Sequence, residues 1–166
     1  MLPLTTLAEA DWPALHRLMR RRKFPHTPAT LQQAAPHFRA ATVLGLKGRG
    51  GLQAGFIFGP PEHGIAFFDA VCRTAAAGRW ATRPVLQALF RHAFAPPPQG
   101  LGLRALWVQP HGRTALQACL AAGFQAVTPL KLRDGSPPVL VITPRLVPIT
   151  FSFNPQQGAH HHGQPV

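Results

Sequence analysis

The chain has 166 residues, the size of one ordinary domain. Apolar residues make up 46% and charged residues 13%, a composition that supports a packed core and excludes intrinsic disorder and collagen-like repeats. Lysine and arginine number 17 against 5 aspartates and glutamates, and this net charge of +12 favours an anionic partner.

The excess of positive charge has alternative explanations. The abundance of arginine, alanine, glycine and proline is typical of a GC-rich coding sequence, so part of the charge carries no functional meaning. The densest cluster, Arg20–Lys23, follows a predicted helix, where cations complement the helix dipole. Nucleic acid stays open as a partner, although no nucleic-acid-binding motif accompanies the charge.

Several classes of protein are not expected. No apolar run approaches the ~20 residues of a membrane span, and the N-terminus lacks a signal-peptide pattern, so we expect a cytoplasmic protein without a membrane partner. Cys72 and Cys119 match neither a zinc nor a redox spacing, in keeping with a reducing compartment. His160, His161 and His162 lie in the C-terminal tail, and neighbouring histidines alone do not predict a metal site.

The first part of the chain predicts a strand and a helix. Leu2–Leu7 is short and apolar, as in a strand, and Trp12–Met19 carries apolar residues at helical spacing. Asp11 is a good N-cap for this helix. Thr6 and Glu9 form a competing capping box, which leaves the start of the helix open by several residues.

A second helix is predicted by its capping signals and by the stretch from Leu31 through Phe38. Thr27 is placed as its cap, and Pro28 as its first residue, where a missing N–H is harmless. Pro36 is expected to end or distort the helix, because an interior proline removes a backbone hydrogen bond.

Three strands are expected next. They are Thr42–Lys47, Leu52–Phe58 and Gly64–Val71, and glycine- and proline-rich turns separate them at Gly48–Gly51 and Gly59–Pro61. Because short turns join only antiparallel neighbours, this segment predicts an antiparallel meander.

The segment after the meander predicts an amphipathic helix. Apolar residues from Ala81 to Ala93 form one stripe, and Arg79, Arg83 and Arg91 lie on another. Thr82 is a suitable cap for this helix.

The rest of the sequence predicts a strand, a helix and a hairpin. The strand is Leu103–Val108, the helix Thr114–Ala122 ends at Gly123, and the hairpin comprises Ala126–Leu132 and Val139–Arg145. The predicted fold is α/β, a single domain over residues 1–148 with a mixed, mostly antiparallel sheet flanked by about four helices, followed by a tail at 149–166.

Three motifs in this order of elements resemble the GNAT superfamily of acyl-CoA N-acyltransferases, and the third is the position of the closing hairpin after Gly123-Phe124. The segment 77–82, Ala-Gly-Arg-Trp-Ala-Thr, with Val85-Leu86 behind it, resembles the family's pyrophosphate loop. Leu103–Val108, a Pro110–Gly112 turn and Leu120–Phe124 resemble its second conserved half. The resemblance covers residues 2–145 and implies that acetyl-CoA is the cosubstrate and an amine the acceptor.

The coenzyme loop departs from the family pattern. The motif's Arg/Gln falls on Ala77 and two of its small residues fall on Trp80 and Thr82, which leaves Gly78 as the only glycine. Backbone N–H groups at a helix N-terminus still suit a pyrophosphate, and Trp80 permits this if its indole points away. The residues that the resemblance implies for coenzyme binding are Val71, Arg73, Gly78, Arg79, Trp80, Thr82 and Arg83. The alternative is an amphipathic helix whose arginines face solvent.

The resemblance also implies positions for proton transfer. Asp69 is the candidate base, because a carboxylate that alternates with apolar residues on a strand is hydrogen-bonded or used; a satisfied structural aspartate is the alternative. The family's tyrosine acid falls on Cys119 and its asparagine on Gly112. Cys119 is therefore a candidate acid, although a cysteine on a helix also serves simply to fill the core. Glu62, His63 and His111 are alternative bases that would act through water.

Two functions remain open at this point. The first is an acetyl-CoA-dependent N-acetyltransferase with a weakened motif. The second is a non-catalytic component of a larger assembly, attached through the C-terminal tail. The Arg79–Arg83 stretch is similar to degenerate GNAT-like proteins of phages and prophages, which implies a virion-associated version of the second function.

Overall fold

Seven strands form one mixed sheet in the computed structural model, which describes residues 3–76, 80–130 and 134–148. Their spatial order is β1-β2-β3-β4-β5-β7-β6, and every neighbouring pair is antiparallel except β4 and β5. The strands are β1 (Leu4–Thr6), β2 (Thr42–Gly48), β3 (Gly51–Phe58), β4 (Ile65–Cys72), β5 (Ala105–Val108), β6 (Gln125–Ala126) and β7 (Leu140–Ile142). The helices are α1 (Trp12–Arg21), α2 (Leu31–Ala40), α3 (Arg83–Phe94) and α4 (Arg113–Ala121). This order confirms the predicted fold class.

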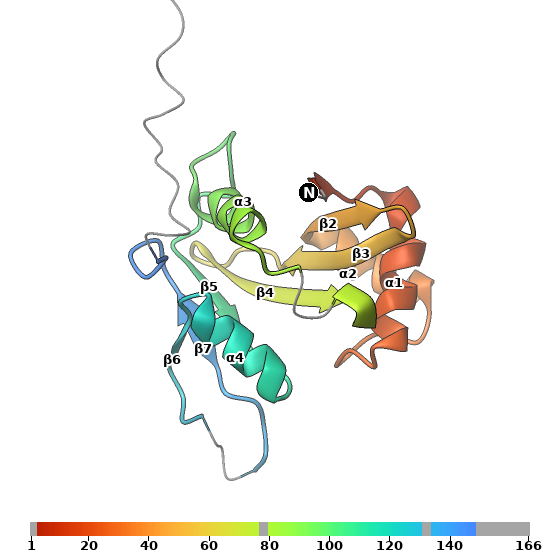
Figure 1. Ribbon diagram of the computed structural model, residues 1–166. Coiled ribbons are helices and arrows are strands. Elements are labelled where there is room, and N and C mark those ends of the chain that lie inside the picture. The colour runs from red at the N-terminus through yellow and green to blue at the C-terminus, as the bar shows by residue number, and fades with distance from the viewer. Residues whose placement is uncertain (1–2, 77–79, 131–133, 149–166) are drawn as a thin grey trace, which may run out of the picture.

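The helices cover the sheet from two sides (Figure 1). One hydrophobic cluster joins α1 and α2 to the sheet through residues such as Leu15, Phe38 and Val71. A second cluster joins α3 to the other face and includes Phe56 and Phe90, and α4 packs against its edge. Two cores on opposite faces are what the alternation of side chains along a strand requires.

The start of α1 differs from both predicted caps. A 3-10 turn at Glu9–Asp11 precedes the helix, and Pro13 lies in its first turn. The Asp11 carboxylate does not cap α1. It accepts a hydrogen bond from the Ala8 N–H at 3.1 Å and forms an ion pair with Lys47 at 2.7 Å, so it ties this turn to β2 instead.

The second helix begins three residues later than its predicted first position. Thr30 caps α2 and forms a reciprocal capping box with Gln33, whereas the Thr27 hydroxyl donates to the Phe24 carbonyl before the helix. α2 continues to Ala40, so Pro36 does not end the helix; that it distorts the helix stays a prediction. Pro36 is exposed while Phe38 is buried, so packing against the sheet holds the helix past the proline.

The closing hairpin forms, but its strands are shorter than predicted. Gln125 and Ala126 pair with β7, and Val127 adds one further backbone hydrogen bond to Val139. The predicted strand to Leu132 was therefore too long, and residues 131–133 lie outside the described part of the chain. Gly123 has φ +100° and ends α4 as predicted, because a left-handed residue there favours glycine.

The central feature for function is the separation of β4 from β5. The two strands pair only at Ile65–Phe67 with Ala105–Trp107. β4 continues to Cys72 beside β3, whereas β5 ends at Val108. Figure 1 shows the two strands diverging past this pairing. Among the described residues, no helix combines the length and hydrophobicity that a bilayer span requires. The predicted tail at 149–166 lies outside the described residues.

Candidate active site

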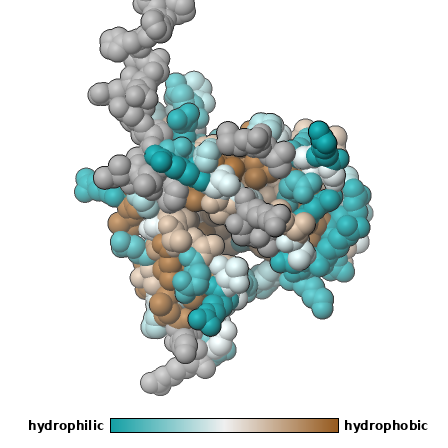
Figure 2. All heavy atoms as spheres, in the orientation of Figure 1, coloured by the Kyte–Doolittle hydropathy of each residue, from teal (hydrophilic) through white to brown (hydrophobic). Residues whose placement is uncertain are grey.

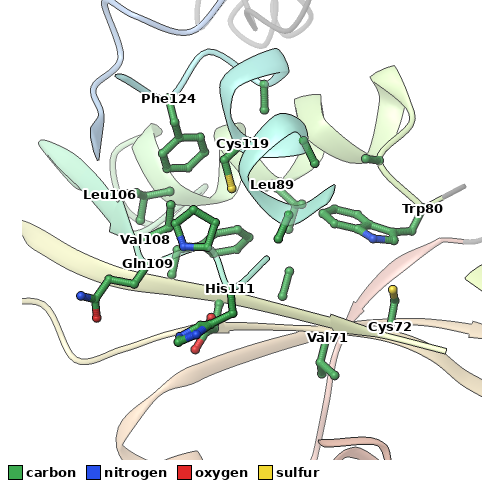
Figure 3. Close-up of a pocket in the computed structure, with 18 of the residues that line it drawn as sticks. Val71, Cys72, Trp80, Leu89, Leu106, Val108, Gln109, His111, Cys119 and Phe124 are labelled. Atoms are coloured by element: carbon green, nitrogen blue, oxygen red, sulfur yellow. The ribbon is translucent and has the colours of Figure 1, made fainter. Parts of the chain in front are cut away.

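A cavity of about 550 Å³ occupies the space where β4 and β5 diverge. Residues from β4, β5, α3, α4 and the loop after α1 line it, and most of its surface is apolar. Figure 3 shows Cys119, Leu89, Trp80 and His111 around this space, and Figure 2 shows a hollow in the same face of the molecule. Its volume and its few polar groups are typical of a small-molecule site.

The edge of β4 supplies backbone groups to this cavity. The Phe67 carbonyl and the Arg73 N–H bond to residues of β3 or its continuation, at Gly59 and Gln53. Because backbone groups alternate along a strand, those of Phe68, Ala70 and Cys72 point the other way, toward β5. β5 does not pair with these three residues. The divergence therefore leaves a row of N–H and C=O groups for a ligand.

Asp69 lies on β4 in the wall of the cavity, as one would expect of the candidate base. Burial raises the pKa of its carboxyl from an ordinary 3.8 to about 7. Removing a carboxylate from water disfavours its charged form, so this group changes protonation near neutral pH. That is the range in which a general base is most effective.

Cys119 lies on α4 and directs its sulfur into the same cavity (Figure 3). Burial, and secondarily the negative charge of Asp69, raise the pKa of this thiol to about 11. The thiol is therefore protonated at neutral pH and holds a proton that it can donate. Asp69 and Cys119 therefore line the same cavity, and the charge of Asp69 favours the protonated form of the thiol.

The two groups approach the cavity from different faces of the sheet. The side chain of Asp69 alternates in register with Val71, which packs against α1. Cys119 and Cys72 pack against the cluster around α3 and α4. Figure 3 shows Cys72 and Val71 on opposite sides of β4. The cavity where β4 diverges from β5 therefore has the Asp69 carboxyl on one side and the Cys119 thiol on the other.

Trp80 lies in the cavity wall, and its indole does not point away from the cavity. Its ring packs against Phe56 with centroids 5.0 Å apart. The indole also lies near the Cys72 thiol (Figure 3). Burial raises the pKa of the Cys72 thiol, and the charge of Arg22 and the neighbouring Trp80 indole offset part of that rise. Trp80 therefore contributes an aromatic ring to the cavity wall.

Of the other residues predicted to bind a coenzyme, some line the cavity and some do not. Val71 lines the cavity, whereas Arg73, Thr82 and Arg83 are exposed and lie outside its lining. The Arg73 guanidinium lies beside the turn between β2 and β3, near Gly50. Thr82 precedes α3 as its N-cap residue without a side-chain bond to the helix. Gly78 and Arg79 lie outside the described residues.

The structure adds cavity residues that sequence reasoning did not select. Arg22, Lys23, Phe24 and Pro25, which follow α1, line the cavity together with Gln109 at the end of β5. The basic cluster had been interpreted only as a complement to the helix dipole, so its position in the site was missed. The Phe-Pro pair directly after the cations was the available signal, because it breaks the helix there.

Of the alternative bases, only His111 lines the cavity. It lies between β5 and α4, and also borders a smaller cavity beside the β6–β7 loop. Glu62 and His63 are exposed in the turn before β4. Within residues 3–76, 80–130 and 134–148, no group of three or more histidine, cysteine or acidic side chains is arranged to hold a metal ion.

Known structures share this architecture. A variant of the spermidine N-acetyltransferase SpeG from Vibrio cholerae superposes with a TM-score of 0.66 and 15% identity, covering 86% of this chain and 93% of the other. The ribosomal-protein-S18-alanine N-acetyltransferase from Escherichia coli superposes with a TM-score of 0.63 and 16% identity, covering 95% of this chain and 98% of that one. The sequence matches no protein-family model and no curated protein. The chain therefore has the GNAT fold of these N-acetyltransferases, with its cavity at the divergence of β4 and β5.

Proposed function

We propose that the protein transfers an acetyl group from acetyl-CoA to a primary amine. The observation that carries this proposal is the cavity between β4 and β5, which holds a carboxyl with a pKa of about 7 opposite a protonated thiol. The fold is that of known N-acetyltransferases, which supports the proposal.

The unpaired edge of β4 suits the arm of the coenzyme. The backbone groups of Phe68, Ala70 and Cys72 would bind the amides of an extended chain as a further strand does. An N–H of this row would donate a hydrogen bond to the thioester carbonyl oxygen, where negative charge develops during attack by the amine. The apolar lining excludes water and strengthens such a bond.

Asp69 and Cys119 divide the proton transfers between them. Asp69 accepts the proton that the amine loses as its nitrogen bonds to the acetyl carbon. Cys119 donates its proton to the sulfur of the departing CoA as the carbon–sulfur bond breaks. The two pKa values, about 7 and about 11, differ in the direction that these roles require.

The test is a measurement of turnover. The purified protein is incubated with acetyl-CoA and a primary amine such as hexylamine, and free CoA thiol is followed while mass spectrometry identifies the N-acetyl product. We expect saturable CoA release with a rate that increases as pH rises through about 7, where Asp69 loses its proton. Absence of product with every amine at saturating acetyl-CoA would contradict the proposal and favour the non-catalytic alternative.

A further inference from the structure

The chain after α1 brings two cations to the cavity. α1 ends at Arg21, and Lys23 takes the left-handed conformation with φ +48°. The Phe24 N–H then donates to the Met19 carbonyl at 2.9 Å, which folds the segment back over the end of the helix. Arg22 and Lys23 consequently line the cavity, while Arg20 and Arg21 in the same cluster lie outside its lining.

The position of Arg22 is fixed by a contact with the far end of β4. Its guanidinium donates a hydrogen bond to the Thr74 hydroxyl at 3.0 Å. Its charge also lowers the pKa of Cys72, against the larger effect of burial. A positive charge therefore stands at the cavity and acts on groups inside it.

The carboxylates of the chain do not balance these cations. The sequence contains five acidic residues, and Asp69 alone among them lines the cavity. Glu9 pairs with Arg39 and Asp11 with Lys47, both away from the site, and Asp134 bonds to Ser136 in the hairpin loop. Glu62 is exposed in the turn before β4. The side of the cavity formed by the loop after α1 is thus positively charged.

We propose that the acceptor amine carries an anionic group, a carboxylate or a phosphate, which Arg22 and Lys23 bind while Asp69 faces the amine. This proposal rests on the proposed function and names its substrate class. A polyamine such as spermidine, the substrate named for one protein of the same fold, is disfavoured by charge, because its second cation would meet Arg22 and Lys23. Specificity here comes from repulsion as well as attraction.

The competing role for these cations is binding of a phosphate of the coenzyme. Two observations favour the acceptor. Arg22 and Lys23 directly follow α1, the helix that covers the same face of β4 as Val71 and Asp69. Phe24 and Pro25, which follow directly, also line the cavity and provide an apolar surface for a carbon chain next to the two charges.

Three amines with the same six-carbon chain test the charge preference. Hexylamine ends in a methyl group, aminohexanoate in a carboxylate and diaminohexane in a second ammonium group. We expect kcat/KM to follow the order aminohexanoate, hexylamine, diaminohexane, with steps on the order of tenfold at low salt that shrink as salt is added. Turnover of hexylamine with equal or better turnover of diaminohexane would overturn the proposal while leaving the proposed function intact. No turnover of any of the three would overturn both.

The double variant Arg22→Gln, Lys23→Gln assigns the preference to these residues. We expect the ratio of kcat/KM for aminohexanoate to that for hexylamine to fall about tenfold, toward one. The double variant Arg20→Gln, Arg21→Gln removes the same charge from the same cluster outside the cavity and should keep the ratio. If the KM for acetyl-CoA rises equally with every acceptor and the ratio stays, the cations bind the coenzyme and the proposal is wrong.

Discussion

The strands of one half of the sheet pair with their neighbours over more residues than the strands of the other half do. β2, β3 and β4 form a meander in which each strand pairs along most of its length with the next. β4 and β5 pair at three positions, and β6 and β7 are short. Phe56 and Phe58 in the meander are fully buried, whereas Val127 beyond β6 is 61% exposed.

This difference separates stability from chemistry. The meander satisfies its backbone groups and buries large side chains on both faces, so it holds the fold together. The divergent region leaves a strand edge unpaired and largely buries the Asp69 carboxyl. Both features lower the stability of the fold unless a ligand binds there. The following variants test that division.

The largest expected effect is on catalysis in the divergent region. Asp69→Asn keeps the size of the side chain and removes the base, so kcat/KM should fall by about 10²–10⁴. Glu62→Gln is the matched control, because it changes an exposed carboxylate in the turn before the same strand. Equal turnover by the Asp69 variant and the wild type in steady-state assays would contradict the assigned role.

The next largest effect is expected on the free energy of unfolding, from a variant in the meander. Phe56→Ala removes a fully buried ring that packs against Trp80, and should lower the free energy of unfolding by about 3–5 kcal/mol. Val127→Ala, at a strongly exposed position, should change it by less than about 0.5 kcal/mol. Urea unfolding followed by fluorescence measures both, and similar costs at the two sites would remove the contrast between the halves.

Asp69→Asn should lower activity but raise the stability of the folded protein above about pH 4. Because burial raises the pKa of its carboxyl in the folded state to about 7, the unfolded chain ionises first as pH rises from about 4. The wild type therefore loses stability between about pH 4 and pH 7, and the loss is complete above pH 7. Asp69→Asn avoids it and should be more stable at pH 8 by about 2–4 kcal/mol.

The control for this prediction is the same comparison of stability at acidic pH. Near pH 4 the carboxyl of Asp69 is neutral in the folded state and only about half ionised in the unfolded chain, so most of the advantage of the asparagine variant should disappear. Unfolding curves at about pH 4.5 and pH 8 give the comparison. An advantage of the same size at both pH values would show that packing rather than the buried charge is responsible.

The smallest effect is expected at Cys119. Cys119→Ala removes the proposed acid, and kcat should fall about tenfold to a hundredfold, less than for Asp69, because a thiolate leaves readily. The loss of activity at high pH that a thiol with a pKa of about 11 produces should also disappear. Cys72→Ala, in the same cavity, should reduce kcat less, and the reverse order would reassign the acid.

The sequence predicted the elements better than the site. Helical spacing, the Gly123 C-cap and the short turns of the meander are local signals, and the order of strands and helices followed from them. The prediction of Thr27 as a cap depends on Pro28 directly after it, whereas in the structure Thr30 caps α2 together with Gln33. α2 continues past Pro36 because packing of Phe38 outweighs the local cost of a proline.

The site needed contacts between distant segments. Asp69 and Cys119 were found by alternation and by register with a family motif, but their placement in one cavity depends on where β4 stops pairing with β5. Arg22 and Lys23 line the cavity next to a left-handed residue; the Phe-Pro pair after them signals the end of the helix but not the contact with β4. Arg73 and Arg83, chosen for their nearness in sequence to the coenzyme loop, lie outside the cavity lining.

The most direct test is calorimetric titration of the protein with acetyl-CoA. Wild type should bind one equivalent, and Ala118→Phe, which adds a ring to an exposed position of α4 that lines the cavity, should weaken binding at least about tenfold. Ala121→Phe, also exposed on α4 but outside the cavity lining, should bind like the wild type. No binding by the wild type at millimolar acetyl-CoA, or equal binding by all three proteins, would contradict a coenzyme site between β4 and β5.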